Sequence, residues 1–288
     1  MFCTTNKHGT EQQKIYWLNM TNDKTSIPKI IHYVWLGESK KDKLIQMCIN
    51  SWKKFCPDYE IIEWNEKRIS DIHNQFLTEA IQEKKWAFAS DYIRLYALFN
   101  FGGLYFDTDL EVKASMDAFL SHDFFCGFEN SDGSPQTALL GAKRHDELIK
   151  KLLDYYEQKH FIINKTLDQT PNPLIFKEIF SQKKSSFKTA DATKRFYLSK
   201  TRVVYPIGYF CRPQKFCKNF ALHHFYGSWL PAKNAEIRKI FKLGPFEILK
   251  TKTPHRAEYP PMLDNEIREL ISFEYKYRRR LHLIIRIS

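Results

Sequence analysis

Residues 87–109, AFASDYIRLYALFNFGGLYFDTD, contain the pattern that decides the fold. Apolar residues recur at helical spacing as far as residue 101, and Gly102-Gly103 then supplies a helix stop. The apolar run Leu104-Tyr105-Phe106 follows at once and predicts a buried strand. Two carboxylates, in Asp107-Thr108-Asp109, come directly after that strand. The stretch therefore predicts an α/β domain with an acidic pair at the carboxyl end of a strand.

The segments on either side of this stretch continue the same pattern. Upstream, an apolar run at residues 30–36, an amphipathic helix at 41–55 ended by Pro57, and a strand at 59–64 follow one another. Downstream, strands are expected at residues 124–128 and 202–205 and a helix at 147–159. This order is typical of an α/β domain with a mainly parallel sheet.

Composition limits the class of protein. The chain has 288 residues with 43% hydrophobic, 27% charged and 15% aromatic residues, which excludes disorder over the whole length. A formal net charge of +12 favours anionic partners such as phosphate esters, nucleic acid or acidic lipid. The six cysteines lack zinc-finger spacing, and no apolar run has the length of a signal peptide or a membrane span. The expected location is therefore the reducing cytoplasm.

The acidic pair Asp107 and Asp109 is the best candidate for chemistry. In an open α/β sheet, ligands bind at the carboxyl ends of strands, and two carboxylates near a core need a compensating cation. Mg²⁺ or Mn²⁺, which prefers oxygen ligands and bridges carboxylates to phosphates, is the natural choice, whereas a solvated acidic turn is the alternative. Asp91 and Arg94 share one face of the preceding helix and suit the binding of hydroxyl and phosphate oxygens, although their spacing alone favours a surface salt bridge.

Three motifs carry a resemblance to a known family. They are residues 27–37 (IPKIIHYVWLG), residues 87–109, and residues 223–229 (HHFYGSW). Together they resemble the family 32 glycosyltransferases, the group with the sugar-binding region that contains the DXD motif. That group includes capsular and lipopolysaccharide sugar transferases and yeast α-mannosyltransferases, with the clostridial glucosylating toxins as distant relatives.

The resemblance implies a GT-A fold, which is Rossmann-like and binds a nucleotide sugar, and transfer of the sugar with retention at the anomeric carbon. The resemblance also implies a role for each site residue. Trp35 is expected to stack on the donor base, Asp91 and Arg94 to hold the donor sugar, and Asp107 to contact ribose and sugar. Asp109 and His224 are expected to bind Mn²⁺ or Mg²⁺, and Ser228 and Trp229 to contact the leaving diphosphate. Adjacent residues of an extended strand point to opposite faces, so only one of His223 and His224 is expected at the metal. The spacing to Gly227 favours His224. No residue stands out as a nucleophile.

The implied function is hexose transfer from a nucleotide sugar to a saccharide or lipid-linked saccharide in the synthesis of bacterial capsule, O-antigen or lipooligosaccharide. UDP-galactose or UDP-glucose is expected ahead of GDP-mannose. Two alternatives remain. A haloacid-dehalogenase-like phosphatase also places Asp-x-Asp after a strand, but it needs a later acidic pair, and the chain has no Asp-Asp dipeptide. A basic nucleic-acid-binding protein would suit the charge, but the chain has no nucleic-acid-binding signature, so no nucleic-acid partner is expected.

The sequence predicts three parts: an N-terminal leader at residues 1–26, a GT-A catalytic domain at 27–232, and a helical, basic C-terminal extension at 233–288. In the last 15 residues five Lys and Arg stand against one Glu, among Leu and Ile. This composition favours peripheral docking at the anionic inner face of the cytoplasmic membrane over a solvated helix.

Overall fold

The computed structural model describes residues 26–214 and 217–225, and the backbone of four further strands within residues 236–287. The helices of the first part are α2 (Lys43–Phe55), α3 (Glu66–Ile69), α4 (Gln75–Gln82), α5 (Trp86–Phe101), α6 (Glu147–Glu157), α7 (Asn172–Lys183) and α8 (Ile207–Phe210). Its strands are β1 (Ile30–Val34), β2 (Glu60–Trp64), β3 (Gly103–Phe106), β4 (Leu110–Val112), β5 (Phe124–Phe128), β6 (Pro135–Ala142), β7 (Ile162–Ile163), β8 (Thr166–Leu167), β9 (Phe196–Ser199), β10 (Arg202–Tyr205) and β11 (Ala221–His223). Two 3₁₀ turns lie at Asp117–Phe119 and Ser185–Thr189.

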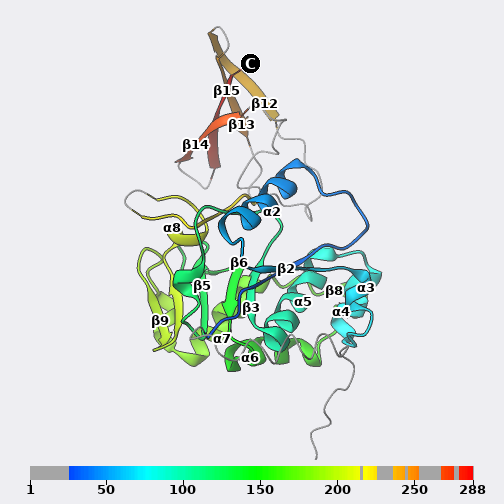
Figure 1. Ribbon diagram of the computed structural model, residues 1–288. Helices are drawn as coiled ribbons and strands as arrows, with labels where there is room; N and C mark the ends of the chain where they lie inside the picture. Colours follow the sequence, from blue (N-terminus) through cyan, green and yellow to red (C-terminus); the bar gives the residue numbers. More distant parts are fainter. Residues whose placement is uncertain are drawn as a thin grey trace, which may run out of the picture. The chain divides into compact units, whose positions relative to one another are not determined.

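A seven-stranded sheet of order β2-β1-β3-β6-β5-β10-β9 forms the centre of this part (Figure 1). Strands β2, β1, β3, β5 and β10 run in one direction, and β6 and β9 run against them. The predicted mainly parallel α/β sheet is confirmed. Strands β1 and β2, joined by α2, form the βαβ unit that the pattern of residues 30–64 predicted, and β3 pairs in parallel with β1 on the other side.

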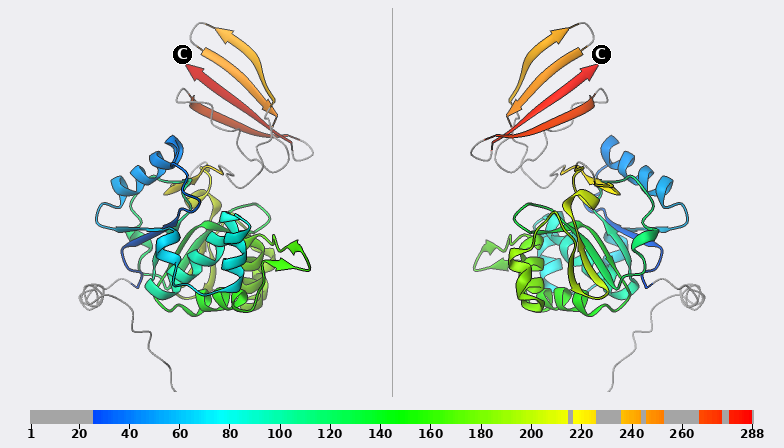
Figure 2. Two further views of the ribbon diagram at one scale, coloured as in Figure 1. Left: turned by 90° about the vertical axis from the view of Figure 1, so that its right-hand side faces the viewer. Right: turned by 90° about the vertical axis from the view of Figure 1, so that its left-hand side faces the viewer.

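Helices cover both faces of the sheet. Helices α4 to α7 pack together and contact β1, β3 and β6, and Figures 1 and 2 show α2 set apart from them. Helix α2 begins where the Asp42 side chain accepts a hydrogen bond from the Ile45 N–H, and it buries Leu44, Cys48 and Trp52. These three residues join one apolar core with residues of β1, β3, β4 and β5.

The junction between α5 and β3 depends on two glycines with positive φ, +67° at Gly102 and +105° at Gly103. A Cβ on Gly103 would lie 2.6 Å from the Ile30 carbonyl oxygen, and one on Gly102 would lie 2.7 Å from the Arg144 nitrogen. Only glycine therefore fits both the conformation and the space. This turn fixes how α5 and β3 meet, and so how their polar residues face each other.

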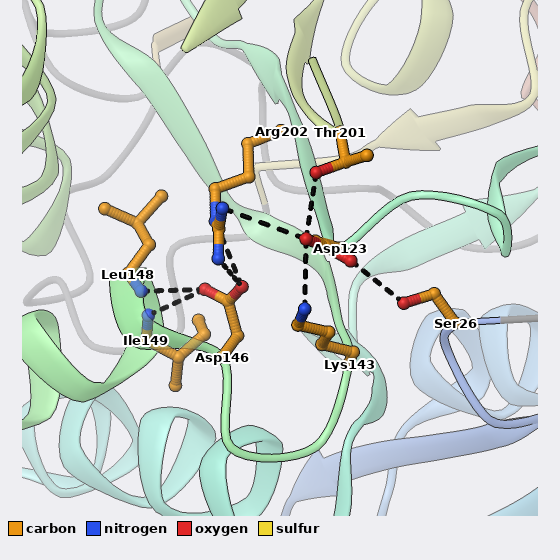
Figure 3. A network of polar contacts seen from close by, with 8 residues as sticks. All are labelled: Ser26, Asp123, Lys143, Asp146, Leu148, Ile149, Thr201 and Arg202. Atoms are coloured by element: carbon orange, nitrogen blue, oxygen red, sulfur yellow. Dashed lines mark hydrogen bonds and ion pairs between the residues drawn. The ribbon is translucent and has the colours of Figure 1, made fainter. Parts of the chain in front are cut away.

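A buried ionic network ties β10 to the start of α6 (Figure 3). The Asp146 carboxylate accepts hydrogen bonds from the Leu148 and Ile149 N–H groups, which caps α6. It also accepts hydrogen bonds from Arg202 Nε at 3.0 Å and Nη2 at 2.7 Å. The Asp146 side chain is fully buried. Asp123 lies beside this pair and accepts from Thr201, Lys143 and Ser26. The network satisfies a buried charge that would otherwise be costly.

The sequence predicted a helical C-terminal extension, and this prediction is wrong. Strands β12 (Glu236–Leu243), β13 (Phe246–Lys252), β14 (Ile267–Tyr275) and β15 (Arg279–Ile287) form a four-stranded antiparallel sheet of order β12-β13-β15-β14. The physical reason is the period of the sequence. Residues 281–287, LHLIIRI, place an apolar residue at every second position and include three isoleucines, which favours a strand over a helix.

The chain divides into two compact units, Met1–Leu222 and His223–Ser288, so the division falls inside β11. Residues 1–25, nearly all of the predicted leader, lie outside the described residues. Within the described part, none of the helices has the length and apolar character needed to cross a bilayer. Cys48, Cys56, Cys126 and Cys217 are free thiols.

Candidate active site

Arg94 is held inside the protein by α5 and its neighbours. Its side chain is 5% exposed, and it donates from Nη1 to the Thr137 carbonyl oxygen at 2.9 Å and from Nη2 to Ser90 Oγ at 3.1 Å. One turn earlier, the Asp91 carboxylate lies 3.0 Å from Nη2, as the i, i+3 spacing predicted. These contacts fix the guanidinium in one orientation.

The same guanidinium reaches the predicted acidic pair. Arg94 Nη2 lies 3.3 Å from Asp107 Oδ1, which also accepts a hydrogen bond from the Tyr105 hydroxyl at 2.9 Å. The Tyr105 ring lies under the guanidinium, with Arg94 Cζ 4.6 Å from the ring centroid. Arg94 thus joins the Asp91 carboxylate of α5 to the Asp107 carboxylate that follows β3. Asp91 and Arg94 are therefore a buried pair and not a surface salt bridge.

Burial shapes the electrostatics of this cluster. It raises the pKa of Asp91 to about 6, and the nearby charge of Asp107 adds to the rise, while the Arg94 guanidinium acts in the opposite direction. Asn172, the first residue of α7, is 2% exposed and donates from Nδ2 to the Asp91 carbonyl oxygen at 3.5 Å. The carboxylate of Asp91 therefore faces the Arg94 guanidinium in a place largely closed to water, and the backbone carbonyl of the same residue faces the Asn172 amide.

Asp107, Asp109 and His223 form the group that could hold a metal ion. Each offers one ligand atom, and the three atoms all lie within 4.8 Å of one another. Two ligands of one Mg²⁺ or Mn²⁺ stand about 3 to 4 Å apart, so small side-chain movements would let all three residues bind one ion. Asp107 uses Oδ1 for Arg94 and Tyr105, which leaves Oδ2 for a cation. Two carboxylates with an imidazole fit a divalent cation, and the imidazole suits Mn²⁺ better than Mg²⁺.

Of the two adjacent histidines, the one in this group is His223, not the His224 that the sequence favoured. His223 is the last residue of β11, which pairs with β4, the strand that follows Asp109. Successive residues of a strand point to opposite sides, so this pairing brings only one histidine to the aspartates. The spacing to Gly227 could not reveal which one, since the choice depends on the register of β11.

Trp35 lies at the same edge of the sheet as the aspartates. Strand β1 pairs in parallel with β3, with His32 opposite Tyr105, so three residues further Trp35 is level with Thr108. Its indole is half-buried and donates from Nε1 to the Ser39 carbonyl oxygen at 2.8 Å, while Lys41 Nζ lies 5.1 Å from the ring centroid. The place agrees with a role at the donor base, and the stacking itself stays a prediction.

The remaining predicted site residues, Ser228 and Trp229, lie outside the described residues. The structure adds four residues that the sequence analysis did not select for the site: Ser90, Tyr105, Thr137 and Asn172. Tyr105 stands two residues before Asp107 and so could have been found as a same-face neighbour. Thr137 and Asn172 come from distant segments, and only the fold brings them to α5.

Residues 42–126 match the family model described as "Glycosyltransferase sugar-binding region containing DXD motif". This region of the chain is therefore similar to the DXD-motif glycosyltransferases. The match covers Asp91, Arg94, Asp107 and Asp109, which are the residues that the geometry brings together. Of the three functions considered from the sequence, this match supports the glycosyltransferase over the phosphatase and the nucleic-acid-binding protein.

Similar curated proteins include inositol phosphoceramide mannosyltransferase 3 of Schizosaccharomyces pombe, 25% identical over 137 residues, which are 45% of this chain and 37% of the relative. Mannosyl phosphorylinositol ceramide synthase SUR1 of Saccharomyces cerevisiae is 27% identical over 169 residues, 55% of this chain and 43% of the relative. Subversion of eukaryotic traffic protein A of Legionella pneumophila is 25% identical over 174 residues, 50% of this chain and 27% of the relative. The chain thus spans less than half the length of these relatives.

Among solved structures, the PaToxG glycosyltransferase is similar with a TM-score of 0.43 and 18% identity, covering 61% of this chain and 79% of that one. A glycosyltransferase involved in the glycosylation of the major capsid of PBCV-1 is similar with a TM-score of 0.40 and 12% identity, covering 68% of this chain and 92% of that one.

Proposed function

We propose that the chain transfers a hexose from a nucleotide sugar to a saccharide acceptor, with a divalent cation held by Asp107, Asp109 and His223. The observation that carries this proposal is Arg94, which joins Asp91 to Asp107 beside that group of possible ligands. A fixed guanidinium next to a cation site suits a donor that carries two phosphates and a sugar.

Each side chain has a role in this chemistry. Asp91 accepts hydrogen bonds from hydroxyl groups of the donor sugar, and Arg94 holds the sugar and keeps the two carboxylates in place. The cation, when bound, offsets the negative charge that grows on the leaving diphosphate. Trp35 stacks on the donor base, and Ser228 and Trp229 contact the diphosphate. Sugar transfer with retention at the anomeric carbon is the expectation that the family resemblance supplies.

The identity of donor and acceptor is the finer part of the proposal. UDP-glucose and UDP-galactose are the first donors to test. GDP-mannose joins them because the names of four similar curated proteins contain mannosyltransferase or mannosyl. Two of those names contain inositol phosphoceramide, a lipid. We therefore place a lipid-linked saccharide ahead of a free one as acceptor, in bacterial surface polysaccharide synthesis at the cytoplasmic face of the membrane.

Donor hydrolysis tests the proposal. Purified protein is incubated with UDP-glucose, UDP-galactose, their N-acetylated forms and GDP-mannose, with Mn²⁺ or with EDTA, and released nucleoside diphosphate is measured. We expect release from one donor with Mn²⁺, and loss of that release in Asp109→Asn. Asp71→Asn, which changes an exposed aspartate away from the group, is the matched control.

A second pair of variants tests the choice of histidine. His223→Ala should raise the Mn²⁺ concentration needed for half-maximal release by at least about ten-fold, as expected when a ligand or its support is lost. His224→Ala should leave that concentration unchanged. The reverse result would restore the sequence-based choice of His224, and metal-independent release would contradict the cation role. A protein that neither hydrolyses nor binds any donor would contradict the proposed function.

A further inference from the structure

Helix α2 has a basic outer face. Its exposed residues are Lys43, Gln46, Met47, Asn50, Lys53 and Lys54, which lie on one side of the helix because they are spaced by one or three positions. The helix sequence contains no acidic residue, and Asp42 just before it is engaged as the N-cap. Lys40, also exposed, precedes the helix. We call Lys40, Lys43, Met47, Lys53 and Lys54 the α2 basic face.

An apolar side chain lies among these cations. Met47 is 40% exposed and is one of only four large hydrophobic residues with such exposure among the described residues. It lies between Lys43 and Lys54 on the helix surface, and Ile49 at the edge of the face is half-buried. An apolar side chain among lysines can be buried at the boundary between lipid headgroups and chains, as in helices that lie at a membrane surface.

The inner side of α2 fixes this face close to the candidate active site. Trp52 is fully buried and donates from Nε1 to the Leu110 carbonyl oxygen at 2.6 Å. Ser51 Oγ accepts from the Val112 N–H at 2.9 Å. Leu110 and Val112 belong to β4, which begins directly after Asp109. The α2 basic face is therefore rigidly attached to the strand that follows the acidic pair.

We propose that the α2 basic face docks on the anionic surface of a lipid bilayer. The α2 basic face is positively charged and is formed by one side of a single helix. Its cations are lysines, which act as point charges and do not require a partner with fixed hydrogen-bond geometry. A fluid anionic surface fits these features better than a specific protein or nucleic acid. The biological role of this docking rests on the proposed function, because docking would bring the site to a lipid-linked acceptor. The docking itself can be measured without any donor.

Co-sedimentation of the full-length chain with vesicles tests the docking. The vesicles contain phosphatidylcholine alone or with about one third phosphatidylserine. We expect binding only to the anionic vesicles. Lys43→Gln with Lys53→Gln and Lys54→Gln should lower the partition coefficient by about 100-fold, because each lysine near the surface contributes about five-fold. The matched control replaces three other exposed lysines, Lys67, Lys150 and Lys151, by Gln and should change binding far less.

Two further variants separate the apolar from the ionic contribution. Met47→Glu should weaken binding to anionic vesicles, whereas Met47→Leu should preserve it. Equal losses in the α2 and control triple variants, or full binding by the α2 variant, would overturn the proposal. So would lysine-dependent retention on RNA or an acidic protein without vesicle binding. Donor hydrolysis by the α2 variant should equal that of the unchanged protein, so failure of docking and failure of the transferase function give different results.

Discussion

Arg94 is the residue whose contacts connect the two carboxylates of the candidate site. Arg94→Lys keeps the charge but loses the fork that holds Ser90, Thr137, Asp91 and Asp107 together. We expect kcat/KM for donor hydrolysis to fall by at least about 30-fold, equivalent to one or two charge-assisted hydrogen bonds. Arg195→Lys, which changes an exposed arginine, should leave it unchanged. Unaltered kinetics in Arg94→Lys would mean that the fork geometry is dispensable.

His32 is fully buried and neutral. Its Nε2–H donates to the Gly102 carbonyl oxygen at 2.8 Å, and Nδ1 accepts from Trp64 Nε1 at 3.2 Å. Burial lowers the pKa of His32 from 6.5 to about 4. Between pH 6.5 and 4 the unfolded chain binds a proton that the native state does not, so stability falls as pH falls, by on the order of 3 kcal/mol.

A comparison with His32→Gln isolates this contribution. The variant should be less stable at pH 7, where it loses both hydrogen bonds, and the difference in urea-unfolding free energy should narrow toward pH 4.5. A difference that stays constant with pH would show that the pKa of His32 is the same in the native and unfolded states, and would contradict the prediction.

At the scale of elements, the Asp146 and Arg202 pair tests how α6 is attached to the sheet. Asp146→Ala removes the α6 cap and leaves Arg202, 11% exposed, without its nearest carboxylate. We expect a loss of about 3 kcal/mol in unfolding free energy. Asp154→Ala in the same helix removes a surface ion pair with Lys150 and should cost less than about 0.5 kcal/mol. Similar losses in the two variants would argue against the buried network as the anchor.

The elements themselves were predictable where the apolar period was clear. The periodic run of residues 41–55 predicted α2, and the run ended by Gly102-Gly103 predicted α5 and β3. Strand β6 was missed because residues 135–142, PQTALLGA, are buried at every position and so have no alternation to detect. The C-terminal extension was wrongly predicted as helical. Its mixture of cations and apolar residues is typical of an interfacial helix, but its apolar residues recur at every second position, which is the period of a strand.

The candidate site divides in the same way. Asp91, Arg94, Asp107 and Asp109 lie within 19 residues, and a local helix, turn and strand bring them together. His223 depends on the pairing of β11 with β4, which no local pattern encodes.

At the scale of the whole molecule, the described core belongs to the first part of the chain. Its residues run from Ile27 to Ala221. A chain ending at Phe225 should therefore unfold within about 4 °C of the full-length protein in a thermal melt followed by circular dichroism. Donor hydrolysis should fall by at least about 100-fold, because Ser228 and Trp229, the proposed diphosphate contacts, are missing. Full activity in the shortened chain would remove both residues from the proposed site.

The turn at Gly102-Gly103 has a consequence for mutational scanning. Neither glycine has a side chain that could touch a ligand, yet any replacement would push α5 away from β3 and separate Arg94 from Asp107. In a saturation library scored only by activity, these two positions would be as intolerant as the acidic residues. In a parallel score for protein abundance, replacements of these glycines would lower the abundance as core replacements do. Replacements of the acidic residues would lower activity but not abundance. Sites chosen for engineering a new sugar preference should therefore avoid this turn and begin at its flanks.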